Sequence, residues 1–239
     1  MMNLLYGTCG ERLGVLRDWR RRCAAVATFG LVVTSALARA DVNPQQVEQA
    51  LNLVPDTQRG TGLYKSCAKC HGTRGQGSDD GDVPLLAGQH RDYLVTQLLR
   101  MRAGARPDLG KSVPKYHSAS VPALKTLQSI VDTAGYVASL PPEPGAQQGP
   151  GHDLDTGHRV FVDRCVECHG PDALGQSDML VPRLRGQNYS YIREQIARLG
   201  DGHRMPRGSP VSEVLGMLTP EESDAVADYL SRLPAVPTN

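Results

Sequence analysis

The stretch "CAKCHG", from Cys67 to Gly72, occurs again in altered form as "CVECHG", from Cys165 to Gly170. Each copy places two residues between its cysteines and a histidine directly after the second cysteine. This pattern is compatible with a zinc site, a redox-active disulfide or a covalently attached haem. The surrounding sequence decides between these chemistries.

The two motifs belong to a long internal repeat with an offset of 98 residues. Residues 83–106, "VPLLAGQHRDYLVTQLLRMRAGAR", align without a gap with residues 181–204, "VPRLRGQNYSYIREQIARLGDGHR". Past Arg106 the copies diverge, and they align again at "TAGYVASLP" and "VADYLSRLP" with an offset of 93. A repeat of this kind predicts two similar domains in tandem.

A run rich in proline and glycine separates the two copies. The stretch "PPEPGAQQGPG", from Pro141 to Gly151, breaks helices and predicts a linker. We therefore expect a first domain at residues 41–141, a linker at 142–151 and a second domain at 152–239. Each domain is small enough to be marginal on an ordinary apolar core, so a bound prosthetic group would stabilise it.

Residues 1–40 have the features of a secretory signal peptide. Three arginines, at positions 20–22, precede the apolar run "CAAVATFGLVVTSALA", and small residues then lead up to Asp41. This run is short for a membrane span, which needs roughly 20 residues. We expect cleavage after Ala40 and a periplasmic mature protein, with an uncleaved membrane anchor as the alternative. The segment before the arginines is long for a signal peptide, which favours a start codon downstream of Met1.

Cleavage would leave 20 basic and 23 acidic side chains, a net charge of −3 with neutral histidines. Nucleic-acid binding requires a concentrated basic surface, so this balance argues against a nucleic-acid partner. The mature part holds four cysteines, and all four lie in the two motifs. No cysteine is left over for the structural disulfides that exported proteins usually carry.

The apolar pattern is helical, and no segment alternates apolar and polar residues as a strand does, so the sequence predicts an all-α fold. In "DYLVTQLLRMRAG" the residues expected on one face are Tyr93, Leu94, Gln97, Leu98 and Met101. We expect Met101 to lie in the core. The last helix has Thr219 as N-cap and Glu222 closing a capping box. Gly60 and Gly157 recur in the helix before each motif and predict a close helix crossing, because a helical glycine costs about 1 kcal/mol relative to alanine.

Haem attachment fits the motifs best. Structural zinc needs four ligands, and each half offers three with no second cysteine pair; a zinc ion shared between the halves is the open alternative. A thioredoxin-like cysteine pair needs a βαβ setting, which the helical pattern does not provide. Two thiols on one helical turn can instead reach the two vinyl groups of a porphyrin, while the adjacent histidine becomes the proximal iron ligand. The residues expected to hold two haem c groups are Cys67, Cys70, His71, Cys165, Cys168 and His169.

With these motifs, each half resembles a class I cytochrome c domain, and the tandem resembles the dihaem cytochrome c4 family. The likeness rests on the two "CxxCHG" motifs, on "VPLLAGQHRDYLVTQL" and its second copy, and on the helices ending "GYVASLP" and "DYLSRLP". It extends over nearly all of residues 57–234. In that family a loop proline carbonyl accepts a hydrogen bond from the proximal histidine. The resemblance assigns this role to Pro84 and Pro182, where the bond would orient the ring and raise its basicity.

Each iron also needs a distal ligand, which the two halves supply differently. In the second half we expect Met205, because it follows the aligned repeat and lies off any helical stripe; Met217 is the rival and is expected to pack as a hydrophobe. The first half has no methionine after Met101. His117 lies close to where the family places its methionine, so we expect it to bind the first iron, with an open or water-ligated iron as the alternative. The histidines expected to be surface residues are His90, His152, His158 and His203.

These features predict a soluble periplasmic electron carrier. Because thioether ligation raises the potential of a haem, we expect the first haem to have the lower potential. The resemblance implies redox proteins as partners, with a terminal oxidase as acceptor. The competing hypothesis is an enzyme, a small peroxidase or a sulfur-compound dehydrogenase with an open catalytic haem in the first domain. A third hypothesis is the cytochrome subunit of a larger dehydrogenase, and the residues do not decide it.

Overall fold

The computed structural model describes residues 42–106, 117–118 and 121–236. The expected signal peptide, residues 1–40, lies outside them. The described residues form helices and no named strand, with one isolated β-bridge between Gln176 and Val181. The all-α prediction is therefore confirmed. Within the same residues, no helix has the length and apolarity that crossing a bilayer requires.

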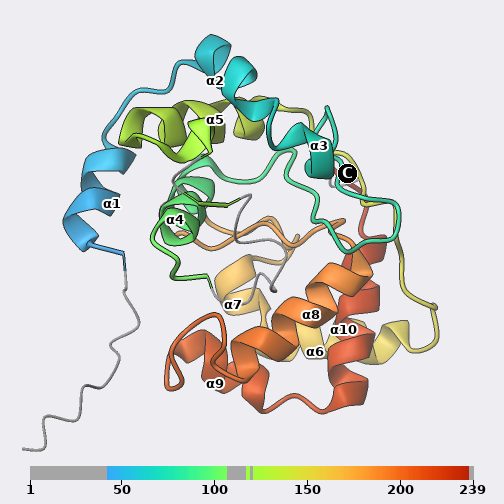
Figure 1. Ribbon diagram of the computed structural model, residues 1–239. Helices are drawn as coiled ribbons and strands as arrows, with labels where there is room; N and C mark the ends of the chain where they lie inside the picture. Colours follow the sequence, from blue (N-terminus) through green and yellow to red (C-terminus); the bar gives the residue numbers. More distant parts are fainter. Residues whose placement is uncertain (1–41, 107–116, 119–120, 237–239) are drawn as a thin grey trace, which may run out of the picture. The chain divides into compact units, whose positions relative to one another are not determined.

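Residues 39–239 form one unit of contacts, which contains two apolar cores. We call the described residues up to 141 the first lobe. Its elements are α1 (Pro44–Leu51), α2 (Thr57–Tyr64), α3 (Ala68–His71), α4 (Arg91–Arg102), η4 (Pro122–Leu124) and α5 (Leu127–Ser139). Helix α5 packs against both α2 and α4, as Figure 1 shows. The centre of this core is made by Val95 and Leu99 of α4 with Ile130 and Val131 of α5, all essentially without exposure to solvent.

We call residues 152–236 the second lobe, and it repeats this arrangement (Figure 1). Its elements are α6 (Leu154–Arg164), α7 (Val166–His169), α8 (Tyr189–Gly200), α9 (Pro210–Gly216) and α10 (Pro220–Arg232). Helix α10 packs against α6 and α8, with Phe161, Val226 and Leu230 buried between them. Helix α9 lies in the interval where the two sequence repeats diverge.

The repeated glycines lie where two helices cross. A Cβ built on Gly60 of α2 would overlap the carbonyl oxygen of Asp132 in α5 and lie 2.8 Å from Tyr136 Cβ. A Cβ on Gly157 of α6 would overlap the carbonyl oxygen of Ala225 in α10 in the same way. Both contacts involve backbone, which cannot rotate aside. The predicted close crossing is therefore confirmed in both lobes.

The capping box at the start of α10 is also confirmed. Glu222 N–H donates to Thr219 Oγ1 at 3.2 Å, and Thr219 N–H donates to Glu222 Oε2 at 3.0 Å. Two N–H groups that the helix itself cannot satisfy thus find acceptors. This fixes the start of the helix that closes the second core.

The linker lies against the second lobe. Gly145 N–H donates to the Gly186 carbonyl at 2.6 Å, and Gly149 N–H donates to Ser231 Oγ at 3.3 Å. A Cβ on Gly149 would lie 2.5 Å from Asp228 Cγ, so glycine allows this close approach. From Gly145 to Gly151 the linker is therefore bonded to α10 and to the loop before α8, while Glu143 pairs with Arg74 of the first lobe.

One expectation for α4, the burial of Met101 in the core, is wrong. The buried side chains of this helix are Leu94, Val95 and Leu99. Met101 is only half-buried, so the prediction that it lies in the core is wrong. The physical reason is that Tyr93 and Gln97 do not face the core of the first lobe: both bond to the Arg204 guanidinium of the second lobe.

Candidate haem sites

Each motif forms a single helical turn directly after a longer helix. In α3 the His71 N–H donates to the Cys67 carbonyl at 2.9 Å, and Gly72, with φ +77°, ends the turn. In α7 the same bond joins His169 to Cys165, also at 2.9 Å. One turn thus holds two thiols and an imidazole close together, which is the arrangement that covalent haem attachment needs.

A proline carbonyl orients the motif histidine in each lobe. The distance from His71 Nδ1 to the Pro84 carbonyl oxygen is 3.1 Å, and that from His169 Nδ1 to the Pro182 oxygen is 3.0 Å. A carbonyl oxygen only accepts, so Nδ1–H is the donor and Nε2 carries the lone pair. The ring therefore presents Nε2 to a metal, and the bond increases its basicity. The structure contains both bonds that the family resemblance implied.

Burial keeps both rings neutral. It lowers the pKa of His71 to about 4, with a further lowering from the nearby His117 and a partial increase from the bond to Pro84. Burial also lowers the pKa of His169, again opposed by its proline bond. Neutral imidazole is the form that binds a metal ion, so both rings suit the proximal position.

The first cysteine of each motif, Cys67 or Cys165, does not have the properties of a redox-active thiol. None of the four motif cysteines is in a disulfide. Burial raises the pKa of Cys165 to about 11 and also raises the pKa of Cys67. Reactive cysteines instead have a lowered pKa, because the thiolate is the nucleophile. Thiols of raised pKa beside a neutral histidine fit a porphyrin-attachment site better than a redox pair.

His117 lies opposite the first motif histidine. The ring centroids of His71 and His117 are 6.3 Å apart, and the ring planes meet at 78°. Two imidazole nitrogens on opposite sides of one metal ion, each about 2 Å from it, place the ring centres roughly 6 Å apart. The observed spacing therefore fits one iron held between the two rings.

In the second lobe the expected distal ligand, Met205, is bonded to another side chain. Met205 is half-buried, and its Sδ lies 2.6 Å from Arg100 Nη1 in α4 of the first lobe. Iron ligation by Met205 would require the thioether to turn away from Arg100. Met217 is 61% exposed, so the expectation that it packs as a hydrophobe is wrong. Its position at the C-cap of the short helix α9 turns the side chain outward.

The remaining histidines differ from one another. His152, His158 and His203 are exposed, as expected for surface residues. His90 is half-buried, and its Nε2 lies 2.7 Å from the Leu174 carbonyl in the second lobe. The expectation that His90 is a surface residue is therefore wrong, because the contact between the lobes covers it.

Sequence reasoning missed the polar residues that join the lobes. Gln89 bonds to the backbone of Arg183, and Gln187 bonds to the backbone of Leu85, through four bonds of 2.8–2.9 Å. Arg204 of the second lobe adds bonds to Tyr93 and Gln97 of the first lobe, and it also bonds to Gln195 within its own lobe. The available signal was the repeat itself, in which Gln89 aligns with Gln187 and Gln97 with Gln195.

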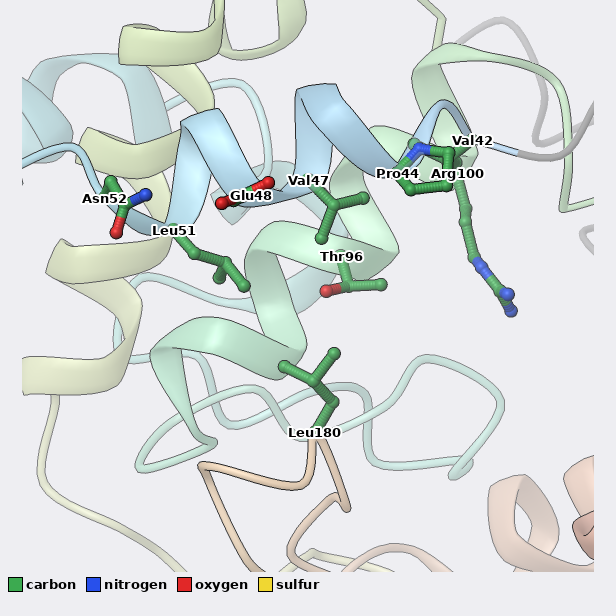
Figure 2. Close-up of a pocket in the computed structure, with 9 residues that line it drawn as sticks. All are labelled: Val42, Pro44, Val47, Glu48, Leu51, Asn52, Thr96, Arg100 and Leu180. Carbon is green, nitrogen blue, oxygen red and sulfur yellow. The ribbon is translucent and has the colours of Figure 1, made fainter.

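One open pocket among the described residues lies away from both motifs. It is an open groove between α1 and α4, with Leu180 of the second lobe at its edge, as Figure 2 shows. Val47 and Leu51 make its apolar wall, and Thr96 faces them from α4. None of the predicted haem residues lines it. This groove is therefore not part of either predicted haem site.

Comparison with known proteins agrees with this geometry. The cytochrome c family profile matches residues 57–141 and again residues 154–234. This protein therefore belongs to the cytochrome c family. The two matches coincide with the two helical lobes, each of which contains one motif.

Relatives of known structure and role define the subgroup. The chain is 32% identical to the thiosulfate dehydrogenase electron acceptor of Thiomonas intermedia (strain K12), over 91% of this chain and 94% of that protein. It is similar to reduced cytochrome c4 from Pseudomonas stutzeri, with 26% identity, a TM-score of 0.62, and coverage of 75% of this chain and 100% of that one. It is also similar to thiosulfate dehydrogenase (TsdBA) from Marichromatium purpuratum, with 28% identity and a TM-score of 0.64, over 75% of this chain and 41% of that one. The protein is a dihaem, cytochrome c4-like electron carrier with two covalently bound haem c groups.

Proposed function

We propose that this chain is a periplasmic carrier that takes electrons from a sulfur-oxidising dehydrogenase and delivers them to an acceptor such as a terminal oxidase. The observation that carries the proposal is the paired site. Each lobe holds a neutral motif histidine, fixed through Nδ1 with Nε2 directed elsewhere, and the two lobes bond directly to each other. Bound haem would supply the reversible one-electron change.

Specific residues would hold the two groups. The thioether bonds would form at Cys67, Cys70, Cys165 and Cys168. His71 and His169 would be the proximal ligands, with Pro84 and Pro182 orienting them. His117 would complete the first site and Met205 the second. The spacing of the His71 and His117 rings supports the first assignment, while the second rests on the position of Met205 after the repeat.

The two ligand sets would give the haems different potentials. An imidazole is a stronger electron donor than a thioether and stabilises ferric iron, so the first site would have the lower potential. Electrons would then enter at the first lobe and leave from the second. In this order the electron donor would bind to the first lobe, and the electron acceptor would bind to the second lobe.

The donor class comes from the relatives. One is named as the electron acceptor of thiosulfate dehydrogenase, and another solved chain is a thiosulfate dehydrogenase of which this chain matches 41%. Joining two thiosulfate ions through a new S–S bond releases two electrons, one for each haem of a dihaem carrier. The stoichiometry of such a donor therefore matches two sites in one chain.

The test is reduction of the purified ferric holoprotein by a thiosulfate dehydrogenase and thiosulfate, followed by visible absorbance. We expect two electrons taken up per chain and no reduction when the dehydrogenase is left out. Absence of reduction would refute the proposed donor.

Addition of carbon monoxide to the reduced protein separates the carrier from the enzyme hypothesis. A carrier with both distal positions filled binds it slowly or not at all. Rapid binding at the first haem would instead indicate an open catalytic site.

A further inference from the structure

Two glutamines join the lobes, and each one bonds to the backbone of the opposite lobe. Gln187 Oε1 accepts from Leu85 N–H at 2.9 Å, and Gln187 Nε2 donates to the Leu85 carbonyl at 2.8 Å. Gln89 Oε1 accepts from Arg183 N–H at 2.9 Å, and Gln89 Nε2 donates to the Arg183 carbonyl at 2.9 Å. Both glutamines are buried. One side-chain amide from each lobe therefore bonds to the backbone of the other lobe.

The backbone groups that the glutamines bind belong to the proline peptide units. The N–H of Leu85 and the carbonyl of Pro84 are the two ends of one peptide bond, and that carbonyl accepts from His71 Nδ1. In the second lobe the peptide bond between Pro182 and Arg183 accepts from His169 in the same way. Each motif histidine is thus connected through a single peptide unit to a glutamine of the opposite lobe.

Peptide units transmit hydrogen bonding because their electrons are delocalised. When the N–H of a peptide donates to an acceptor, its carbonyl oxygen becomes more negative and accepts more strongly. A stronger acceptor at Nδ1–H makes the imidazole a better electron donor to iron. That change favours the ferric state and lowers the reduction potential.

We propose that Gln187 tunes the potential of the first-lobe haem and that Gln89 tunes that of the second-lobe haem, each by polarising the peptide unit that holds the opposite proximal histidine. The two glutamines are positioning residues that act through the proline peptides. The inference rests on one haem c in each lobe with His71 and His169 as proximal ligands. Its consequence is that contact between the lobes sets both potentials, so a separated lobe would have a higher potential than the same lobe in the intact chain.

The alternative is that the glutamines only clamp the lobes together. If the glutamines were only a clamp, replacing either one would shift both reduction potentials equally or shift neither. The crossed relation is the distinguishing feature, because a change in one lobe is expected to shift the haem of the other. The pseudo-symmetric pair also supplies its own control, since each variant has an internal reference haem.

The experiment is potentiometric titration of holoprotein carrying Gln187→Met or Gln89→Met, which removes the amide at similar side-chain volume. Loss of a ligand's own hydrogen-bond partner typically changes metal affinity 10- to 100-fold. The glutamine lies one hydrogen bond further from the iron than the proline carbonyl does. We therefore expect the equilibrium constant for reduction of the haem to rise about threefold, which is equivalent to about 28 mV for one electron. Gln187→Met should raise only the reduction potential of the first-lobe haem, and Gln89→Met should raise only that of the second-lobe haem.

A matched control is Tyr93→Phe. It removes the bond from Arg204 to the Tyr93 hydroxyl across the same contact but touches neither proline peptide. We expect both potentials to be unchanged. If a methionine variant does not fold, Gln187→Asn and Gln89→Asn keep the amide but shorten its reach by one methylene and should give the same crossed shifts at smaller size.

The two haems are distinguished by the red charge-transfer band of a thioether-bound ferric haem, which is expected from the second lobe only. If the unmodified protein lacks that band, the proposed Met205 ligation fails, and the haem methyl resonances then assign the potentials to the lobes. A shift in the haem of the mutated lobe, an equal shift in both haems, the same shift in Tyr93→Phe, or no shift in any glutamine variant would overturn the crossed tuning.

Discussion

Replacement of Gly60 by alanine should destabilise the first lobe, although alanine is the better helix former. The new methyl group would overlap the Asp132 carbonyl oxygen and lie 2.8 Å from Tyr136 Cβ, where ordinary contact begins at 3.4 Å. Overpacking of this kind costs about 1–3 kcal/mol, and a rigid backbone neighbour places it near the upper end. Subtracting about 1 kcal/mol of improved helix propensity leaves a net loss of about 2 kcal/mol.

The same helix provides the control. Gly62 also lies in α2, and a Cβ there would meet nothing within 4 Å. Gly62→Ala should therefore stabilise the lobe by up to about 1 kcal/mol through helix propensity alone. The two alanine variants should differ by about 3 kcal/mol although they have the same composition.

The assay is thermal unfolding of the ferric holoprotein followed by circular dichroism, with haem content checked by intact mass. A loss of about 2 kcal/mol corresponds to a decrease in Tm of roughly 8–16 °C for a domain of this size. Gly157→Ala should have the equivalent effect on the second lobe, where the overlap is with Ala225. Equal stability of Gly60→Ala and Gly62→Ala would show that the helix crossing does not require glycine.

Three further predictions concern the buried acid, a helix cap and the distal ligand. Burial alone would raise the pKa of Asp132, but bonds from Arg59, Asp56 N–H and Gln128 lower it below its usual value; its contribution is therefore present above about pH 4 and lost as pH falls. Asp132→Asn should cost about 2 kcal/mol at pH 7 and flatten the acid limb of a stability–pH curve, and an unchanged curve would contradict this. Thr219→Ala should cost about 1 kcal/mol in urea unfolding through loss of the α10 cap, and a midpoint equal to wild type would exclude that role. His117→Met should raise the potential of the first haem in a redox titration, because a thioether replaces an imidazole; a potential that stays the same would show that His117 is not the ligand.

The fold was largely predictable because its main features are periodic or local. Helical spacing, the capping box at Thr219 and the repeated glycines each depend on a few neighbouring residues, and the structure contains all of them. The two motif histidines could be read from their spacing alone. Their proline partners could be named only through the family resemblance, because the bond joins residues 13 positions apart.

The contact between the lobes could not be predicted from one sequence. Gln89 and Gln187 are ordinary polar residues before a helix, and only the tertiary arrangement brings each to the backbone of the other lobe. The same contact explains why His90 was placed wrongly, since a polar side chain facing a second lobe has the same local pattern as one facing solvent. Met217 was misplaced because its position at the C-cap of α9 turns the side chain outward.

Low-temperature electron paramagnetic resonance of the fully oxidised holoprotein tests the central claim most directly. We predict two low-spin ferric signals of equal intensity, one from a bis-imidazole site and one from an imidazole–thioether site. The angle of 78° between the His71 and His117 rings further predicts a strongly anisotropic signal for the first site, rather than the rhombic signal of parallel rings. A high-spin ferric signal, or two signals of the imidazole–thioether type, would contradict the account.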